Sequence, residues 1–158
     1  MKKKIILFVC SGNTCRSVMA QGLFTKLRDE LYPKINYKAD SAGIMAIEGI
    51  PPTDKAILCM AKLEIDISNY QSKPISREII NNASIILTMT NHQRDFLMKF
   101  FPVANNKIFL FRIYCNDNHY IENQEIEDPY GKTTMFYKGI CYQLKQDIKR
   151  LLIKIKEE

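Results

Sequence analysis

A short apolar run near the N-terminus passes into a helix-forming segment after only six intervening residues. Residues 5–9 read Ile-Ile-Leu-Phe-Val, and the lack of polar alternation predicts a parallel strand that is buried on both faces of a sheet. From residue 16 to residue 31 the apolar positions recur at steps of three and four, which predicts a helix ended by Pro33. A buried strand followed directly by a helix is typical of α/β proteins with parallel sheets.

The remainder of the chain repeats this alternation of strands and helices. Further strands are predicted at residues 37–42, 85–89 and 108–111. Short helices are predicted at the capping residues Thr53, Ser76 and Asn91, and a long closing helix near Thr133. Residues 112–132 are polar and are predicted to form a long loop. Together these elements predict one α/β domain over residues 1–158, with three layers and a four-stranded parallel sheet flanked by helices.

The composition indicates a folded globular protein. Hydrophobic residues make up 46% of the chain and charged residues 25%, which excludes the disordered, collagen-like and disulfide-scaffold classes. Lys and Arg outnumber Asp and Glu by 23 to 17, and the net charge of +6 favours either anionic partners or simple solubility. The basic residues are dispersed without interleaved aromatic residues, so we expect no nucleic-acid partner.

The cysteines and the apolar runs predict the compartment. Five irregularly spaced cysteines are typical of reduced thiols rather than of a secreted disulfide framework. The run at residues 5–10 is too short for a signal peptide, and no run approaches the ~20 apolar residues of a membrane span. We therefore expect a cytoplasmic protein without a membrane partner. His92 and His119 lack metal-ligand spacing to the cysteines, so no metal is expected.

The segment between the first strand and its helix has the composition of an anion-binding loop. Five residues separate Cys10 from Arg16, enough to turn backbone N–H groups toward one point, and the helix N-terminus adds unpaired N–H groups and a positive dipole end. Gly12 and Asn13 tolerate the positive φ that such a cup requires. The residues predicted to bind phosphate are Ser11, Gly12, Asn13, Thr14, Cys15, Arg16 and Ser17.

Two side chains of this loop suit phosphoryl transfer. Cys10 lies at the floor of the cup, near the helix dipole, Arg16 and a hydroxyl donor such as Ser17, so it is predicted to be a thiolate nucleophile. The planar guanidinium of Arg16 can bind two phosphoryl oxygens. Taken alone, Cys10 would more often be a small buried hydrophobic residue at a strand end, but Gly12, Asn13, Arg16 and Ser17 around it favour the nucleophile.

The predicted long loop supplies a candidate acid. Transfer of a phosphoryl group to sulfur requires a group that protonates the leaving atom. Asp128 is the candidate, because Pro129 stiffens the backbone beside it and the ring of Tyr130 could form a wall of the pocket. An Asp-Pro pair can also be an ordinary turn, but a long loop after the last strand can return over the carboxyl edge of the sheet.

These motifs resemble the low-molecular-weight protein tyrosine phosphatase family over nearly the whole chain. The resemblance rests on Cys10 to Ser17, on Ser41-Ala42-Gly43, on Leu87-Thr88-Met89 and on Asp128-Pro129. It implies the low-molecular-weight phosphatase fold with strand order 2-1-3-4, a phosphocysteine on Cys10, and a phosphoryl group held by Arg16 and the loop amides. It further implies that Asp128 acts first as acid and then as base, that inorganic phosphate leaves as product, and that no cofactor takes part.

Within the family the chain is more similar to the bacterial protein arginine phosphatases. Thr14 stands where tyrosine phosphatases usually carry an aliphatic residue, Gly131 where they often have a second aromatic, and Thr90 where they tend to have Asp. Val18 and Gln21 depart from the common Pro and Glu of the family. The resemblance implies phosphorylated proteins as partners and phosphoarginine as substrate, with phosphotyrosine the alternative, and we assign Thr14 and Tyr130 to substrate contact.

Other functions stay open at this point. An arsenate reductase has a similar loop, but it relays electrons through a further cysteine pair, and residues 88–100 contain no cysteine. A phosphoprotein-binding module would keep the anion cup without turnover. By the resemblance, Cys10 and Cys15 can form a reversible disulfide under peroxide, while packing alone also explains Cys15. We expect a monomer.

Overall fold

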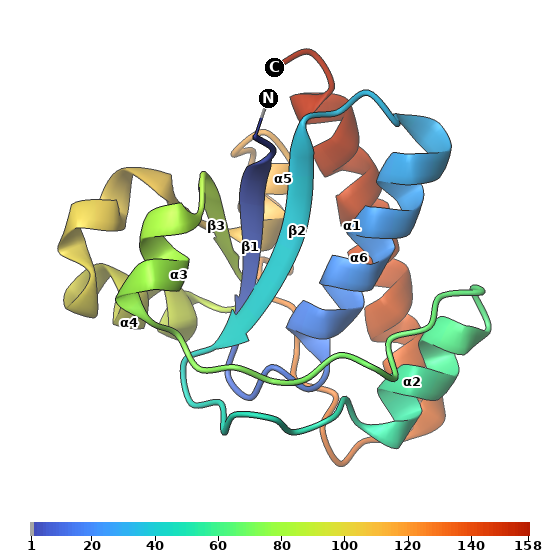
Figure 1. The fold of residues 1–158 in the computed structure, drawn as a ribbon. Helices are drawn as coiled ribbons and strands as arrows, with labels where there is room; N and C mark the ends of the chain where they lie inside the picture. Colours follow the sequence, from blue (N-terminus) through green and yellow to red (C-terminus); the bar gives the residue numbers. More distant parts are fainter. Residues whose placement is uncertain (1) are drawn as a thin grey trace.

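Four parallel strands form the centre of the protein, whose structure, a computed structural model, describes residues 2–158 (Figure 1). The strands are β1 (Lys4–Cys10), β2 (Tyr37–Gly43), β3 (Ile85–Thr88) and β4 (Ile108–Leu110). The helices are α1 (Arg16–Leu31), α2 (Asp54–Ala61), α3 (Arg77–Asn82), α4 (Asn91–Phe100), α5 (Phe111–Cys115) and α6 (Thr134–Ile155), with a 3-10 helix at Pro102–Lys107. The sheet order β2-β1-β3-β4 confirms the predicted parallel fold.

Strand β1 lies in the middle of the sheet because its side chains suit burial on both faces. Ile6 and Phe8 pack into one core with side chains of α1, α5 and α6, whereas Leu7 and Val9 pack into a second core with side chains of α3 and α4. All four side chains are fully buried. Figure 1 shows the corresponding layers, with α1 and α6 on one side of the sheet and α3 and α4 on the other.

The carboxyl ends of the strands meet at one edge, away from the chain termini. Both termini lie at the top of Figure 1, while the loop from β1 to α1 lies at the bottom. The register of β1 with β2 pairs Cys10 with Gly43, and the register of β1 with β3 pairs Val9 with Thr88. Segments that follow β1, β2 and β3 therefore converge below this edge.

Two predicted boundaries were wrong. Phe111 begins α5 instead of ending the fourth strand, so the predicted loop at 112–132 starts only after Cys115. The reason is that Phe111, Tyr114 and Cys115 all face the core at helical spacing.

The cap of α4 is Thr90 rather than Asn91. The Thr90 hydroxyl accepts from the Gln93 amide at 3.3 Å, and the Gln93 side chain accepts from the Thr90 amide at 3.0 Å. This reciprocal pair is a capping box, and it satisfies two backbone donors at once. The Asn91 amide instead donates to Glu125 Oε1 at 2.8 Å, in the long loop.

Within residues 2–158, no helix combines the length and the apolar character that a membrane crossing requires.

The buried tyrosines predict a loss of stability in alkali. Burial raises the pKa of Tyr37 above its ordinary 10.0, with a further contribution from its bond to Glu158, and raises the pKa of Tyr137 to about 12. Above pH 10 the unfolded chain releases these protons while the folded chain keeps them, so the free energy of unfolding falls as pH rises. We expect the absorbance of these two buried tyrosinates to appear together with the loss of circular dichroism, and Tyr37→Phe to weaken the pH dependence. Ionisation of both tyrosines near pH 10 in the folded state would contradict this.

Candidate active site

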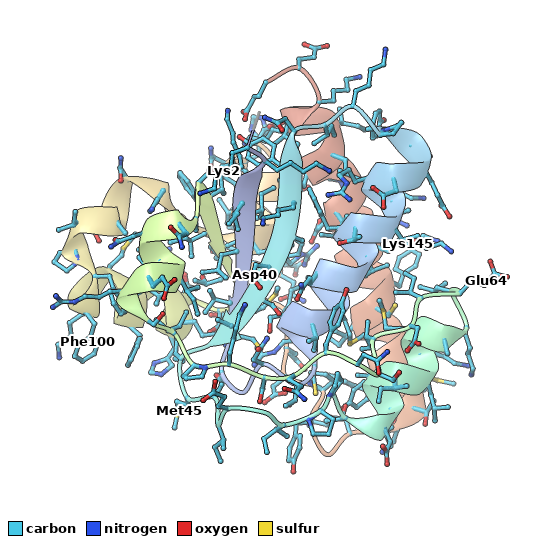
Figure 2. All side chains as sticks on the ribbon, viewed as in Figure 1. Lys2, Asp40, Met45, Glu64, Phe100 and Lys145 are labelled. Atoms are coloured by element: carbon cyan, nitrogen blue, oxygen red, sulfur yellow. The ribbon has the colours of Figure 1, made fainter. Side chains whose placement is uncertain are left out.

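The loop after β1 is held by its carbonyl groups, which bind segments outside it. The Cys10 carbonyl accepts from the Ile44 amide at 3.0 Å, and the Ser11 carbonyl accepts from the Met45 amide at 2.9 Å. Figure 2 shows Met45 at the lower edge of the molecule, below the carboxyl ends of the strands. In a trans peptide the C=O and the next N–H point in opposite directions. Outward carbonyls therefore turn the amides of Ser11 and Gly12 toward the inside of the loop.

Asn13 shapes the middle of the loop. Its φ is 56°, in the left-handed region that Asn tolerates, whereas Gly12 does not adopt the positive φ expected for it. The side chain of Asn13 is buried, donates to Ser17 Oγ at 2.7 Å and accepts from the Lys73 amide at 3.0 Å. Asn13 is therefore bound to Ser17, in α1, and to Lys73, in the segment between α2 and α3, and these two bonds fix the turn.

Gly43, at the end of β2, leaves room for the loop to approach. A Cβ at this position would lie 2.5 Å from the Ser11 carbonyl oxygen and 3.0 Å from the Asn13 amide nitrogen. Both are backbone atoms and cannot rotate away. Any larger residue at position 43 would therefore displace the loop.

The sulfur of Cys10 lies at the floor of the loop and has two hydrogen-bond neighbours. Ser17 Oγ lies 2.9 Å from it, and the Asn13 amide donates to it at 3.2 Å. Ser17 Oγ already accepts from the Asn13 side chain, so its own hydrogen is free to point at the sulfur. Two donors aimed at one sulfur are the arrangement that stabilises a thiolate.

Arg16 is buried beside the sulfur, and its guanidinium is partly unpaired. Nη1 donates to the Ile126 carbonyl at 2.9 Å, and Nη2 lies 3.8 Å from Asp128 Oδ2. Nε is buried and has no hydrogen-bond partner among the described residues. A buried donor without a partner is unfavourable, so the site gains free energy when an anion accepts from it.

The predicted long loop returns across the carboxyl edge of β3. The Ile126 amide donates to the Met89 carbonyl at 3.0 Å, and Asp128, two residues further on, lies over the loop after β1. Asp128 stays half exposed, with 57% of its side-chain surface accessible, and its Oδ1 accepts from the Tyr130 amide at 3.0 Å. A carboxyl at the open side of the pocket can meet first a leaving atom and then the water that replaces it.

Most of the sequence-predicted residues surround one pocket of about 170 Å³. Its walls are Cys10, Gly12, Thr14, Cys15, Arg16, Asp128 and Tyr130. Asn13 and Ser17 lie behind the wall as supports for the loop, and Ser11 turns its hydroxyl toward Gln93, which donates to it at 3.2 Å. The volume suits a phosphoryl group with the adjoining part of a side chain.

Several residues at the site have roles that sequence reasoning did not assign. Ile126 contributes a backbone carbonyl, which leaves no mark in the sequence. Gln93 stands three residues after Thr90, a capping-box spacing that could have been recognised. Thr53 was predicted only as a helix cap and Tyr137 not at all, yet Thr53 Oγ1 lies 3.4 Å and Tyr137 Oη 3.3 Å from Cys15 Sγ.

The protein has an α/β fold with a loop of inward amides after its first strand. A sulfur lies at the floor of this loop, and an arginine and a carboxylate lie at its wall. This combination defines an enzyme that transfers phosphoryl groups to cysteine. Comparison with known proteins gives the same class. The family model for low molecular weight phosphotyrosine protein phosphatase matches residues 5–158. The chain belongs to this family, and it is a cysteine-dependent protein phosphatase of low molecular weight.

Individual relatives carry two different names. A protein-arginine-phosphatase of Geobacillus stearothermophilus is 32% identical and covers 97% of both chains. A low molecular weight protein-tyrosine-phosphatase of Acinetobacter johnsonii is 34% identical and covers 87% of both. Among solved structures, a cysteine-to-serine mutant of YwlE arginine phosphatase with a phosphorylated active-site serine superposes with a TM-score of 0.90. It is 27% identical and covers 98% of this chain and 97% of that one.

Two glycine substitutions test whether the loop depends on the space at Gly43. Gly43→Ala should lower the free energy of unfolding by about 1–3 kcal/mol and abolish phosphate binding, because the new methyl group meets backbone atoms of the loop. Gly139→Ala on α6 is the control, since a Cβ there meets nothing within 4 Å. It should stabilise the helix by about 0.5–1 kcal/mol and leave binding unchanged. Calorimetric titration with inorganic phosphate measures the affinity of both variants. An unaltered affinity in Gly43→Ala would show that the loop does not need the space at Gly43.

Proposed function

We propose that the protein hydrolyses phosphorylated side chains of proteins through a phosphocysteine on Cys10, with phosphoarginine as its preferred substrate. The observation that carries the proposal is the pocket in which a sulfur with two hydrogen-bond neighbours, a partly unpaired Arg16 and the carboxyl of Asp128 converge. The phosphorylated serine reported in the related mutant structure supports attack from the floor of this loop.

The first step would transfer the phosphoryl group to sulfur. The Cys10 thiolate attacks phosphorus from the floor of the pocket, an S–P bond forms, and the bond from phosphorus to the substrate nitrogen or oxygen breaks. The inward amides of the loop and Arg16 hold the three equatorial oxygens, on which negative charge accumulates in the transition state. Asp128, protonated at the start, gives its proton to the leaving atom.

The second step would release phosphate. A water enters where the leaving group departed, the Asp128 carboxylate takes its proton, and the oxygen attacks phosphorus as the S–P bond breaks. Inorganic phosphate leaves, the thiolate is restored, and Asp128 is protonated again. The bond from Arg16 to the Ile126 carbonyl keeps the guanidinium in the same orientation through both steps.

The preference for phosphoarginine rests on the polar wall of the pocket. Thr14 lines the pocket and carries a hydroxyl, whereas an aliphatic residue at this position would make the wall apolar. Asp128, also in the wall, can accept from guanidinium N–H groups in charge-assisted hydrogen bonds. Tyr130, an exposed ring at the rim, can cover the flat face of either a guanidinium or a phenol. One polar group of this kind is worth about 1–3 kcal/mol in discrimination.

The cysteines outside the loop give no support to an arsenate reductase. Cys59 and Cys141 face a different pocket, which also contains Lys62 and Tyr142, and burial raises the pKa of both thiols. Cys115 is fully buried, and burial raises its pKa as well. A relay of electrons requires thiolates near the nucleophile, which these residues do not supply.

Substitution of the nucleophile and of the acid tests the mechanism. Cys10→Ser should abolish turnover while phosphate still binds, because the loop amides and Arg16 remain. Asp128→Asn should slow hydrolysis of substrates with poor leaving groups by about 10²- to 10⁴-fold and affect an activated aryl phosphate much less. Steady-state kinetics with a series of aryl phosphates measures this dependence. Equal loss across the series would remove Asp128 as the acid, and turnover in Cys10→Ser at the wild-type rate would remove Cys10 as the nucleophile.

Substitution of Thr14 tests the substrate. The wild type should have a higher kcat/KM for phosphoarginine peptides than for phosphotyrosine peptides of the same sequence. Thr14→Ile should shift the ratio toward phosphotyrosine by about tenfold. Thr14→Val removes the hydroxyl with little change in shape, so it separates polarity from size. A wild type that prefers phosphotyrosine would leave the phosphatase chemistry standing and overturn the phosphoarginine assignment.

A further inference from the structure

The two halves of the phosphate loop are held by different parts of the protein. The first half depends on the contacts of Cys10 and Asn13 described above, which come from the loop itself and from segments after β2. The second half, Thr14 and Cys15, has contacts on α2 and α6, in addition to the bond from the Met19 amide of α1 to the Cys15 carbonyl. Thr53, the N-cap of α2, and Tyr137, in the first turn of α6, supply them.

Thr53 binds the loop through its backbone. Its amide donates to the Thr14 carbonyl at 3.0 Å. This bond turns the Thr14 carbonyl outward and therefore turns the Cys15 amide inward, toward the position of a phosphoryl oxygen. Thr53 is itself fixed, because its hydroxyl accepts from the Ala56 amide at 3.3 Å and its carbonyl accepts from the Ile57 amide at 3.0 Å.

Three side chains close a ring behind this part of the loop. Cys15 Sγ lies 3.3 Å from Tyr137 Oη and 3.4 Å from Thr53 Oγ1, and the two oxygens are 3.1 Å apart. Each group has one hydrogen to donate and a lone pair to accept, so the ring is complete when all three are protonated. Burial and the bond to Cys15 raise the pKa of Tyr137 to about 12, so the phenol keeps its hydrogen at neutral pH and into the alkaline range.

We propose that Thr53 and Tyr137 are positioning residues that hold Thr14 and Cys15 in the geometry needed to bind the phosphoryl group and to discriminate between substrates. They act through the loop, and no part of either lines the pocket. Because Thr14 does line it, a shift of the 14–15 peptide changes both anion affinity and substrate preference. The inference rests on the proposed phosphatase site, but its main readout, binding of inorganic phosphate, does not require turnover.

The structure offers a matched control for each residue. Tyr37 is a second buried tyrosine, whose hydroxyl binds Glu158 at 2.7 Å far from the loop, so Tyr37→Phe removes a comparable hydrogen bond from the opposite end of the protein. Ser76 caps α3 through the Ile79 amide as Thr53 caps α2, so Ser76→Ala matches the loss of a helix cap. Thr53→Ser keeps the hydroxyl and serves as the rescue variant for Thr53→Val.

Calorimetry and kinetics should separate these variants. Tyr137→Phe and Thr53→Val should weaken inorganic phosphate binding by about fivefold, the effect of one neutral hydrogen bond, and lower the ratio of phosphoarginine to phosphotyrosine kcat/KM. Thr53→Ser should restore both values. Tyr37→Phe and Ser76→Ala should lower thermal stability by a similar amount and change neither.

The reactivity of Cys10 supplies an independent readout. Its hydrogen-bond neighbours are Asn13, in the first half of the loop, and Ser17, in α1, whereas Tyr137 bonds to Cys15 and Thr53, so Tyr137→Phe should leave the pH dependence of alkylation by iodoacetate unchanged. A shift in that dependence would mean that the two halves are not separately held, and would overturn the inference.

Four further outcomes bear on the positioning role. Wild-type phosphate affinity and selectivity in both Tyr137→Phe and Thr53→Val would overturn the inference, as would equal losses in the matched controls. Circular dichroism identifies a variant that does not fold. If Tyr137→Phe is such a variant, the phosphate affinities of Thr53→Ser and Thr53→Val decide whether the ring positions the loop. If the wild type binds phosphate but hydrolyses neither peptide, the proposed function fails while the phosphate titrations still test the positioning role.

Discussion

Outward hydrogen bonding of the loop carbonyls is the constraint on which the site depends. A loop of this length can turn its peptide planes in many ways, and only planes with carbonyls facing away from the centre leave N–H groups for an anion. The Cys10, Ser11 and Thr14 carbonyls are each bound by an amide from a segment outside the loop. The proposed anion site is therefore assembled before any ligand arrives, which would lower the free energy of reorganisation on binding.

This constraint explains why distant segments belong to the site. The parallel pairing of β1 and β2 places Gly43 beside Cys10, and the chain that continues from Gly43 supplies the amides of Ile44 and Met45. A side chain on Gly43 would occupy the space in which these bonds form. The strand register, the missing Cβ and the orientation of two peptide planes are thus parts of one arrangement, and each is effective only with the others.

The sequence was a sufficient guide where the signal was local. Apolar runs predicted β1, β3 and β4, the segment closed by Gly43 predicted β2, and the segment from Cys10 to Ser17 predicted the loop, because each of these signals lies in consecutive residues. The five-residue helix α5 was missed because its three buried positions are too few to establish a helical period. Tyr137 and Cys15 are 122 positions apart in the sequence, so no local pattern joins them. The contact of Ile126 with Arg16 is made by a backbone carbonyl, which every residue type has. Such partners follow from the packing of α6 and of the long loop, which local patterns do not specify.

In the proposed mechanism, the arrangement also separates the demands of the two chemical steps. Cys10 and Arg16 must keep one geometry throughout, and both are buried and held by short bonds to Ser17 and to the Ile126 carbonyl. Asp128 must lose a proton and regain it, and it is half exposed on a segment that Pro129 stiffens. Burial would raise the free energy of its charged form, and greater freedom would move it away from the leaving atom. An exposed carboxyl on a stiff backbone meets both requirements, while the buried loop keeps the phosphoryl oxygens in place.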